Sequence, residues 1–224
     1  MKKLTYKLNF KNNKHICIIV LLINFKNIIL KGFSTTVKPN HIKTTNKMVI
    51  TALMAALVMT STFIKIQIPL GSSHTMIHLG NAFCILSGLL LGPVYGGLAA
   101  GIGSLLFDLL NPMFIMSAPT TLIFKFIMVF ICGTISRQNK YKINTVWLYR
   151  IASTVGLFVY TTLYIIKTFI VNKFLIGMTL EATTLFIGKS LIVFFLNSLM
   201  AVIIAVPLSI TLKRALKQNK MLDI

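Results

Sequence analysis

Residues 92–110 read GPVYGGLAAGIGSLLFDLL, an apolar stretch of near-transmembrane length with a single acid, Asp108, close to its end. The whole chain of 224 residues contains only three acidic residues, so an acid in this place is unusual. The nearest base at a similar depth is Lys125, early in the next apolar run at Pro119–Ile135. A charge at membrane depth is costly unless it is paired or faces a polar cavity. We therefore expect Asp108 and Lys125 to mark a functional site.

The composition predicts an integral membrane protein. Hydrophobic residues make up 56% of the chain and charged residues only 12%, which is too apolar for a soluble domain of this length. The formal net charge is +20, but the bases lie at the ends of apolar runs and in one loop, so no nucleic-acid-binding face is expected. The three cysteines are isolated in apolar stretches, which indicates neither a disulfide framework nor a zinc site. We expect no metal and no cofactor.

Six apolar segments predict an all-α fold, a bundle of six membrane helices. They lie near Met48–Ile68, Ile77–Leu91, Val94–Leu110, Pro119–Ile135, Trp147–Ile170 and Leu185–Leu212. Gly92-Pro93 predicts a tight turn between the second and third segments, which makes them antiparallel neighbours. The six-helix domain would cover residues 48–217. It would follow a basic, poorly structured extension at 1–47 and precede a short tail at 218–224.

The basic residues predict the orientation in the membrane. With the N-terminus inside, the cytoplasmic side receives the basic leader, the bases of one loop and those that follow the last helix. The opposite side receives little more than Lys173, which Glu181 balances. The positive-inside rule therefore places both termini in the cytoplasm. We expect a multi-pass protein of the cell membrane, specifically of a bacterial plasma membrane.

Polar side chains from all six predicted helices fall near the outer surface, which predicts a pocket for a small polar molecule. The candidate substrate-binding residues are His78, Asn81, Asp108, Lys125, Tyr160, Tyr164 and Asn197. Lys65, Lys167 and Lys189 fall at the same level, but bases at helix ends also extend to the membrane interface without a further role. Asp108 and Lys125 would either contact substrate or form a buried ion pair, and the sequence leaves both possibilities open.

Small residues predict close helix packing. Gly92, Gly96, Ala100, Ser104 and Asp108 follow one another at four-residue spacing, which allows another helix to approach closely. The first helix carries a second, weaker pattern, A-x-x-x-A, at Ala52 and Ala56. Ordinary packing inside the bundle would explain either pattern equally well.

Motifs for hydrolytic chemistry are absent, so we predict no catalytic residues. Without a G-x-x-x-x-G-K-[ST] loop the chain cannot itself hydrolyse ATP, and neither H-E-x-x-H nor G-x-S-x-G occurs. His74 and His78 are four residues apart, but no acidic or thiol ligand is near in sequence, which disfavours a metal site. Two alternatives stay open. One is a membrane enzyme with Asp108 and Lys125 as acid and base; the other is a secondary transporter, although we see no inverted repeat.

Five stretches of the sequence form a recognisable set: IHLGN at 77–81, GLLLGPVYGG at 88–97, GIGS at 101–104, DLL at 108–110 and APTTLIFK at 118–125. Together they resemble the substrate-binding S component of energy-coupling-factor (ECF) vitamin transporters. The closest group is the one for riboflavin, hydroxymethylpyrimidine or pyridoxine-like substrates. The resemblance extends over about residues 47–217. The family's usual Leu-Gly-Asp is here Leu79-Gly80-Asn81, and Asn111-Pro112 replaces the Gly that commonly follows the Asp-Leu-Leu run.

The resemblance implies a receptor for a water-soluble vitamin or vitamin precursor. It implies six helices and a pocket near the outer face. It also implies that Ala52 and Ala56 dock onto a transmembrane coupling subunit, and that two ATPase subunits drive release of the substrate inward. The partners expected from it are the vitamin-like substrate, these subunits and membrane lipid.

Overall fold

The computed structural model describes residues 41–70, 73–138 and 144–218, all within one compact unit, Lys38–Ile224. Most of the predicted extension at 1–47 and the tail after Gln218 lie outside the described residues. The elements are α2 (His41–Phe63), β1 (Lys65–Leu70), β2 (Ser73–His78), α3 (Gly80–Leu91), α4 (Pro93–Leu109), the 3-10 turn η1 (Ile115–Ser117), α5 (Ala118–Ser136), α6 (Thr145–Ile170), the π-helical turn η2 (Val171–Leu175) and α7 (Leu180–Gln218).

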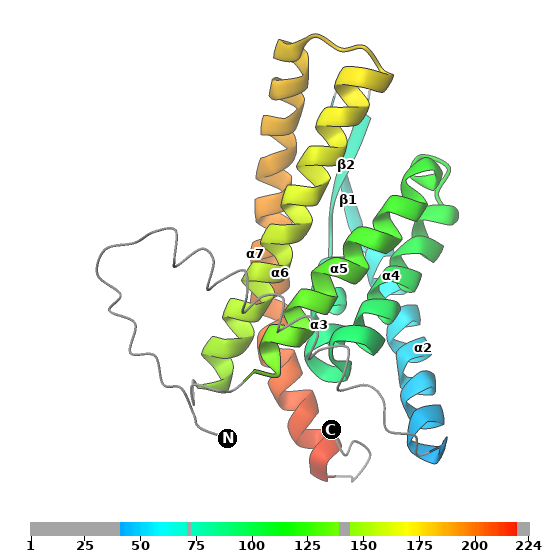
Figure 1. Cartoon of the computed structure of the whole chain (residues 1–224), viewed down its shortest axis with the longest axis vertical. Coiled ribbons are helices and arrows are strands. Elements are labelled where there is room, and N and C mark those ends of the chain that lie inside the picture. Colours follow the sequence, from blue (N-terminus) through cyan, green and yellow to red (C-terminus); the bar gives the residue numbers. More distant parts are fainter. Residues whose placement is uncertain (1–40, 71–72, 139–143, 219–224) are drawn as a thin grey trace, which may run out of the picture. The chain divides into compact units, whose positions relative to one another are not determined.

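The described residues are mainly helical, as predicted, and the helices pack side by side (Figure 1). Three helical segments are long and apolar enough to cross a membrane: Ile115–Ser136, Thr145–Leu175 and Leu180–Arg214. Three shorter apolar helices accompany them: Lys47–Phe63, Gly80–Leu91 and Pro93–Leu109. These features agree with a helical membrane protein. The number of membrane crossings and the side of the termini stay predictions.

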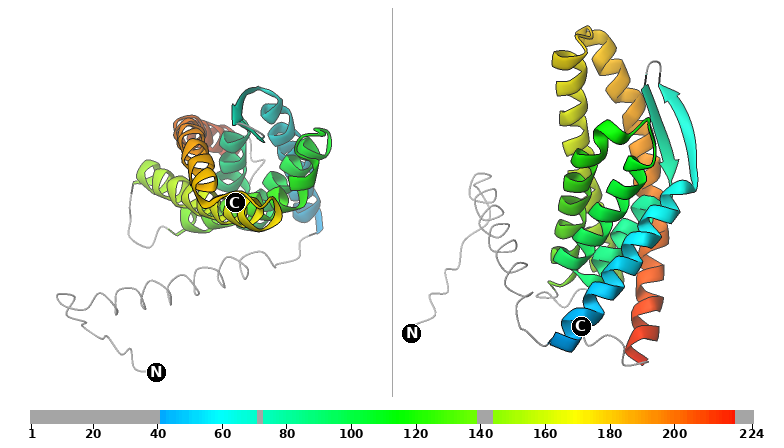
Figure 2. Two further views of the ribbon diagram at one scale, coloured as in Figure 1. Left: turned by 90° about the horizontal axis from the view of Figure 1, so that it is seen from above. Right: turned by 90° about the vertical axis from the view of Figure 1, so that its right-hand side faces the viewer.

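The one departure from the helical prediction is a β-hairpin. The apolar pattern predicts a first helix that extends to Ile68 and a second that begins at Ile77, and both boundaries are wrong. Instead α2 ends at Phe63, and β1 pairs with β2 in antiparallel register, with Lys65 opposite His78. The cause is local: the run from Ile64 to Ile68 alternates isoleucine with Lys and Gln, which is the two-residue period of a strand. The hairpin runs beside α7 (Figure 2).

Glycines let α4 lie against three other helices at once. A methyl group on Gly96 would come within 2.7 Å of the Cα atom of Gly88 on α3. Gly97 and Gly101 face Phe126 and Leu122 of α5, and Gly103 faces the backbone oxygen of Ala55 on α2. The predicted small-residue stripe is therefore internal packing between α3 and α4.

The turn between α3 and α4 depends on the two residues predicted for it. Gly92 has a φ of 86°, a left-handed conformation that residues with a Cβ rarely adopt. Pro93 is the first residue of α4, where its missing N–H leaves no hydrogen bond unmade. The Arg137 guanidinium donates to the backbone oxygen of Leu91 at 2.9 Å and so satisfies a carbonyl at the end of α3.

Helix α3 is the centre of the bundle. Of its 12 residues, 11 are buried, and it contacts α2, α4, α5 and α7. Ser87 on this helix donates to the backbone oxygen of Gly96 at 2.9 Å, which ties α3 to α4. The N-terminal end of α3 points at the cavity described next, because Asn81 in its first turn is one of the lining residues.

Candidate functional site

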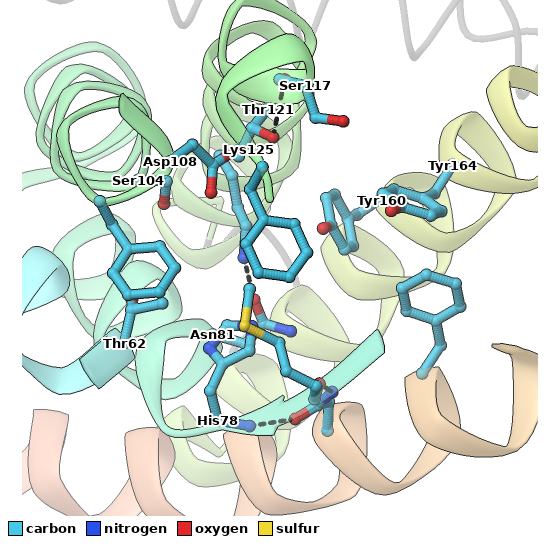
Figure 3. Close-up of a pocket in the computed structure, with 15 residues that line it drawn as sticks. Thr62, His78, Asn81, Ser104, Asp108, Ser117, Thr121, Lys125, Tyr160 and Tyr164 are labelled. Atoms are coloured by element: carbon cyan, nitrogen blue, oxygen red, sulfur yellow. Dashed lines mark hydrogen bonds between the residues drawn. The ribbon is translucent and has the colours of Figure 1, made fainter. Parts of the chain in front are cut away.

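One cavity collects side chains from all six described helices and from strand β2 (Figure 3). Its lining residues are Thr62, Met76, His78, Asn81, Ser104, Phe107, Asp108, Phe114, Ser117, Thr121, Lys125, Tyr160, Tyr164, Phe194 and Asn197. All seven residues named from the sequence as substrate-binding candidates are among them. The structure therefore brings the predicted residues together, and whether they bind a substrate stays a prediction.

Lys125 reaches the cavity from α5 and is held from two sides. Its side chain is only 3% exposed. The ammonium group donates a hydrogen bond to Oδ1 of Asn81 on α3, and it lies 4.7 Å from the centre of the Tyr160 ring on α6. A cation over an aromatic face is attracted by the ring's negative face. Lys125 thus links three helices with groups that carry no negative charge.

Asp108 reaches the same cavity from the end of α4 and is 5% exposed. The Thr121 side chain lies next to its carboxylate, and the positive charges of Lys125, Lys167 and Lys65 act on it. Within the described part of the chain, Asp108 and Lys125 are not in salt-bridge contact. The structure thus gives Lys125 an amide as its direct hydrogen-bond partner and leaves the carboxylate facing the cavity.

Strand β2 is fixed over the cavity by one side chain of α7. The Oδ1 atom of Asn197 accepts a hydrogen bond from the backbone N–H of His78 at 3.0 Å. Its Nδ2 atom donates to the backbone oxygen of Met76 at 2.9 Å. The His78 ring in turn accepts a hydrogen bond from the backbone N–H of Gly80 through Nδ1, at 3.0 Å. The sequence placed His78 at a helix start; it lies instead at the end of a strand.

The ionisation of His78 follows from its surroundings. Desolvation inside the protein, together with the charges of Lys125 and Lys65, lowers the pKa of His78 to about 3. The ring is therefore neutral at physiological pH, and its Nδ1 atom is free of a proton, as the hydrogen bond from Gly80 requires. His78 adds no charge to the cavity.

Aromatic rings form one wall of the cavity. Tyr164 and Phe194 meet edge to face with their centres 4.7 Å apart, and Tyr160 lies 6.2 Å from Phe194 in the same manner. In Figure 3 the two tyrosines lie on one side of the cavity and Asp108 on the other. Phe107 and Phe114 also line it. Such rings offer flat apolar faces to a planar ligand.

Two further lysines lie behind the lining residues. The Lys65 ammonium lies 4.7 Å from the centre of the Phe107 ring and donates to Oδ1 of Asn111 at 3.3 Å. Lys167 donates to the hydroxyls of Ser117 at 3.1 Å and Thr120 at 2.8 Å. Neither lysine lines the cavity itself. The third base considered with them, Lys189, is exposed on α7.

Several lining residues were not among the candidates predicted from the sequence, for identifiable reasons. Ser104 and Thr121 precede Asp108 and Lys125 by four residues, and Phe194 precedes Asn197 by three, so helical spacing was a usable signal. Met76 was missed because it precedes the helix expected to begin at Ile77, and the strand that carries it was not predicted. In the described ranges no group of three or more His, Cys, Asp or Glu side chains is placed to hold a metal ion.

The A-x-x-x-A pattern lies on a different face from the cavity. Ala52 and Ala56 are exposed on α2, whereas Ala55 and Val58 of the same helix are buried. Leu53 beside them is 60% exposed. Ala52 and Ala56 therefore lie on an exposed, apolar face of α2.

A comparison with individually curated proteins gives no match. The sequence does match one protein family over residues 42–214, which is well over half of the chain. The family is described as the S component of the ECF-type riboflavin transporter, a family of transporter subunits and not of enzymes. The matched range contains every residue that lines the cavity. The chain belongs to the S-component family of ECF-type riboflavin transporters.

Proposed function

We propose that this chain captures a water-soluble vitamin or vitamin precursor for uptake by an ECF-type transporter. S components bind small vitamin substrates and associate with an ECF module, and the family match supports the same role here. The observation that carries the proposal is the cavity, where buried polar groups from five elements meet a wall of aromatic rings. A concave site of mostly apolar walls and a few converging polar groups is the usual form of a small-molecule site.

In the proposed complex a planar ring of the substrate packs against Tyr160, Tyr164 and Phe194. Polar atoms at the edge of the ring then meet Asp108, Asn81 and Lys125, which project into the cavity from three different helices. Because these groups are fixed by packing and by hydrogen bonds before the ligand arrives, little ordering is needed on binding. High affinity is the expected result.

The proposed orientation has both termini in the cytoplasm and the cavity open to the outside of a bacterial plasma membrane. The distribution of the basic residues supports it, since Arg137 and Lys213 then lie on the inner side and the hairpin on the outer side. Substrate would enter from outside beside the hairpin, because strand β2 contributes lining residues directly.

Coupling would use the exposed face of α2. Ala52 and Ala56 are small and exposed, so a helix of a transmembrane coupling subunit could approach the α2 backbone closely there. Two ATPase subunits bound to that partner would supply the energy for release inward. The docking face and the cavity are separate, which allows binding and transport to be tested independently.

Riboflavin titration of the purified protein, followed by uptake in vesicles, tests this function. The chain alone should bind ligand without ATP and fail to accumulate it, whereas vesicles that also contain the coupling subunit and ATPases should accumulate it when ATP is present. Accumulation by the chain alone on an ion gradient would identify a secondary transporter. Chemical conversion of the ligand would identify an enzyme.

The aromatic wall offers a matched pair of variants for the same assay. Phe194→Ala removes a lining ring, and Phe195→Ala removes its 69%-exposed neighbour. Removing an aromatic ring on which a base stacks costs about 1–3 kcal/mol of binding energy. Phe194→Ala should therefore weaken binding by about fivefold or more. Phe195→Ala should leave the affinity as it is. Mass spectrometry of a copurifying small molecule would identify the natural substrate directly.

A further inference from the structure

The charges around the cavity do not balance. Asp108 is the one acidic residue that lines it in the described structure. Lys125 lines it as well, and the ammonium groups of Lys65 and Lys167 contact the lining residues Phe107 and Ser117. The three ammonium groups therefore surround a single carboxylate.

The described residues outside the cavity do not supply the missing negative charge. Only three acidic residues occur in the sequence. Glu181 is exposed in the first turn of α7 and does not line the cavity. Asp223 lies outside the described residues.

Lys125 is the lysine for which this imbalance matters most. It is almost completely buried, so it cannot extend to the membrane interface as a base at a helix end would. Its ammonium donates to an amide oxygen and lies over an aromatic ring, both uncharged. Asp108 acts on Lys125 electrostatically but makes no salt bridge with it in the described structure. A buried cation without an anionic partner is strongly unfavourable. A ligand that brings an anion into the cavity would remove that penalty.

We propose that the natural substrate is a planar-ring compound that carries an anionic group, a carboxylate or a phosphate, which the Lys125 ammonium binds in the cavity. Lysine binds such oxygens as a point charge, and the ring of the ligand packs on the aromatic wall. Lys65 and Lys167 add attraction from behind the lining residues. This inference rests on the proposed capture function and specifies the chemical class of its substrate.

Two matched ligand pairs test the proposal on the full chain purified in a neutral detergent. Riboflavin is compared with riboflavin 5′-phosphate, and nicotinamide with nicotinate, by calorimetric titration at low and at high salt. Where the protein binds the members of a pair, the anionic member should bind at least tenfold more tightly than the neutral one. High salt should reduce this difference in affinity. The two pairs also separate phosphate from carboxylate.

Two substitutions connect the preference to the residues. Asn81→Asp places a carboxylate on the Lys125 ammonium. It should reduce the affinity for the anionic ligand at least tenfold more than the affinity for the neutral one. Asn144→Asp is the control: Asn144 is exposed, and an aspartate there still caps α6 by accepting from the backbone N–H of Val146. It should leave the preference unchanged. Because Asn81→Asp could disturb folding, a single cooperative thermal unfolding transition like that of the unchanged protein serves as the check.

The outcomes separate this inference from the function on which it rests. Equal or tighter binding of the neutral member overturns the anionic substrate and leaves the capture function standing. If no member of either pair binds, the charge of the small molecule that copurifies with the protein, identified by mass spectrometry, decides between the outcomes. An anion supports the proposal; a neutral molecule overturns it, and no bound molecule at all overturns both proposals.

Discussion

The side-chain amide of Asn197 on α7 forms hydrogen bonds with the backbone of strand β2 at His78, and so joins the hairpin to this helix. It accepts from the His78 N–H at 3.0 Å and donates to the carbonyl two residues earlier at 2.9 Å. One amide thus occupies the place that a neighbouring strand would take beside β2. Because Asn197 is 3% exposed, both of these hydrogen bonds are shielded from water.

Asn197→Leu should release the hairpin. The variant leaves a donor and an acceptor of β2 without their partners, at about 1–3 kcal/mol each. Faster hydrogen–deuterium exchange at residues 76–78 and at least tenfold weaker ligand binding are the expected results. Leu199→Ala, a change at an exposed position on the same helix, serves as the control. Unchanged exchange in Asn197→Leu would show that the amide does not hold the strand.

Asp108 and Lys125 should be energetically coupled although they make no direct ion pair in the described structure. Each acts electrostatically on the other. Asp108→Asn or Lys125→Met alone should destabilise the protein or weaken ligand binding, whereas the double variant should be less harmful than the sum. We expect a coupling energy of about 0.5–3 kcal/mol from denaturant unfolding in detergent. Strict additivity would exclude the coupling.

Gly96→Ala should destabilise the bundle and Gly188→Ala should not. The added methyl at Gly96 would lie 2.6 Å from the backbone oxygen of Ser87, so α3 and α4 must separate. Overpacking of this kind costs about 1–3 kcal/mol. A methyl at Gly188, also within a helix, meets nothing within 4 Å, and alanine is the better helix former. Thermal unfolding compares the two variants; equal midpoints would contradict the close approach.

Ala52→Leu and Ala56→Leu should separate binding from transport. Both positions are exposed on α2 and away from the cavity, so ligand affinity should stay the same. If the coupling subunit packs closely here, the larger side chains should reduce cellular uptake severely and prevent copurification of the partner. Thr154→Leu, at an exposed site on α6, should affect neither. Wild-type uptake in both leucine-substituted variants would refute docking on this face.

His78 should make the ligand-free protein less stable in acid. Its pKa of about 3 in the folded protein lies below the ordinary value of 6.5, so below pH 6.5 the unfolded chain binds a proton that the folded one does not. Stability is therefore lost as the pH falls from about 6.5 towards 3. Because the ring is half-buried, we expect no more than about 2 kcal/mol between pH 7 and pH 5.

His78→Gln should lose less stability over the same range of pH. The other three histidines of the chain are common to both proteins, so their contributions cancel in the comparison. Thermal unfolding of the two proteins at pH 7 and pH 5 measures the difference. Parallel losses would exclude His78 as the titrating group.

The helices were predictable because their apolar runs are long, and the hairpin was not because its alternation is short. Five residues from Ile64 to Ile68 look apolar enough to continue a helix, and only their two-residue period indicates a strand. The grouping of Asp108, Lys125 and Tyr160 could be predicted because they lie at a similar depth along the predicted membrane helices. The hydrogen-bond partners of these residues could not be predicted, since the bond from Lys125 to Asn81 joins residues 44 positions apart.

The burial of α3 has a consequence for how the chain enters the membrane during synthesis. Twelve helical residues extend about 18 Å, less than a bilayer's hydrocarbon core of about 30 Å. Since nearly every residue of α3 is buried within the protein, α3 is not expected to be stable in lipid alone. We expect α3 to enter together with α4 as one hairpin, and to reach its final environment only when α7, its last partner to emerge from the ribosome, has arrived. A chain truncated before α7 would then expose α3 to the membrane quality-control machinery.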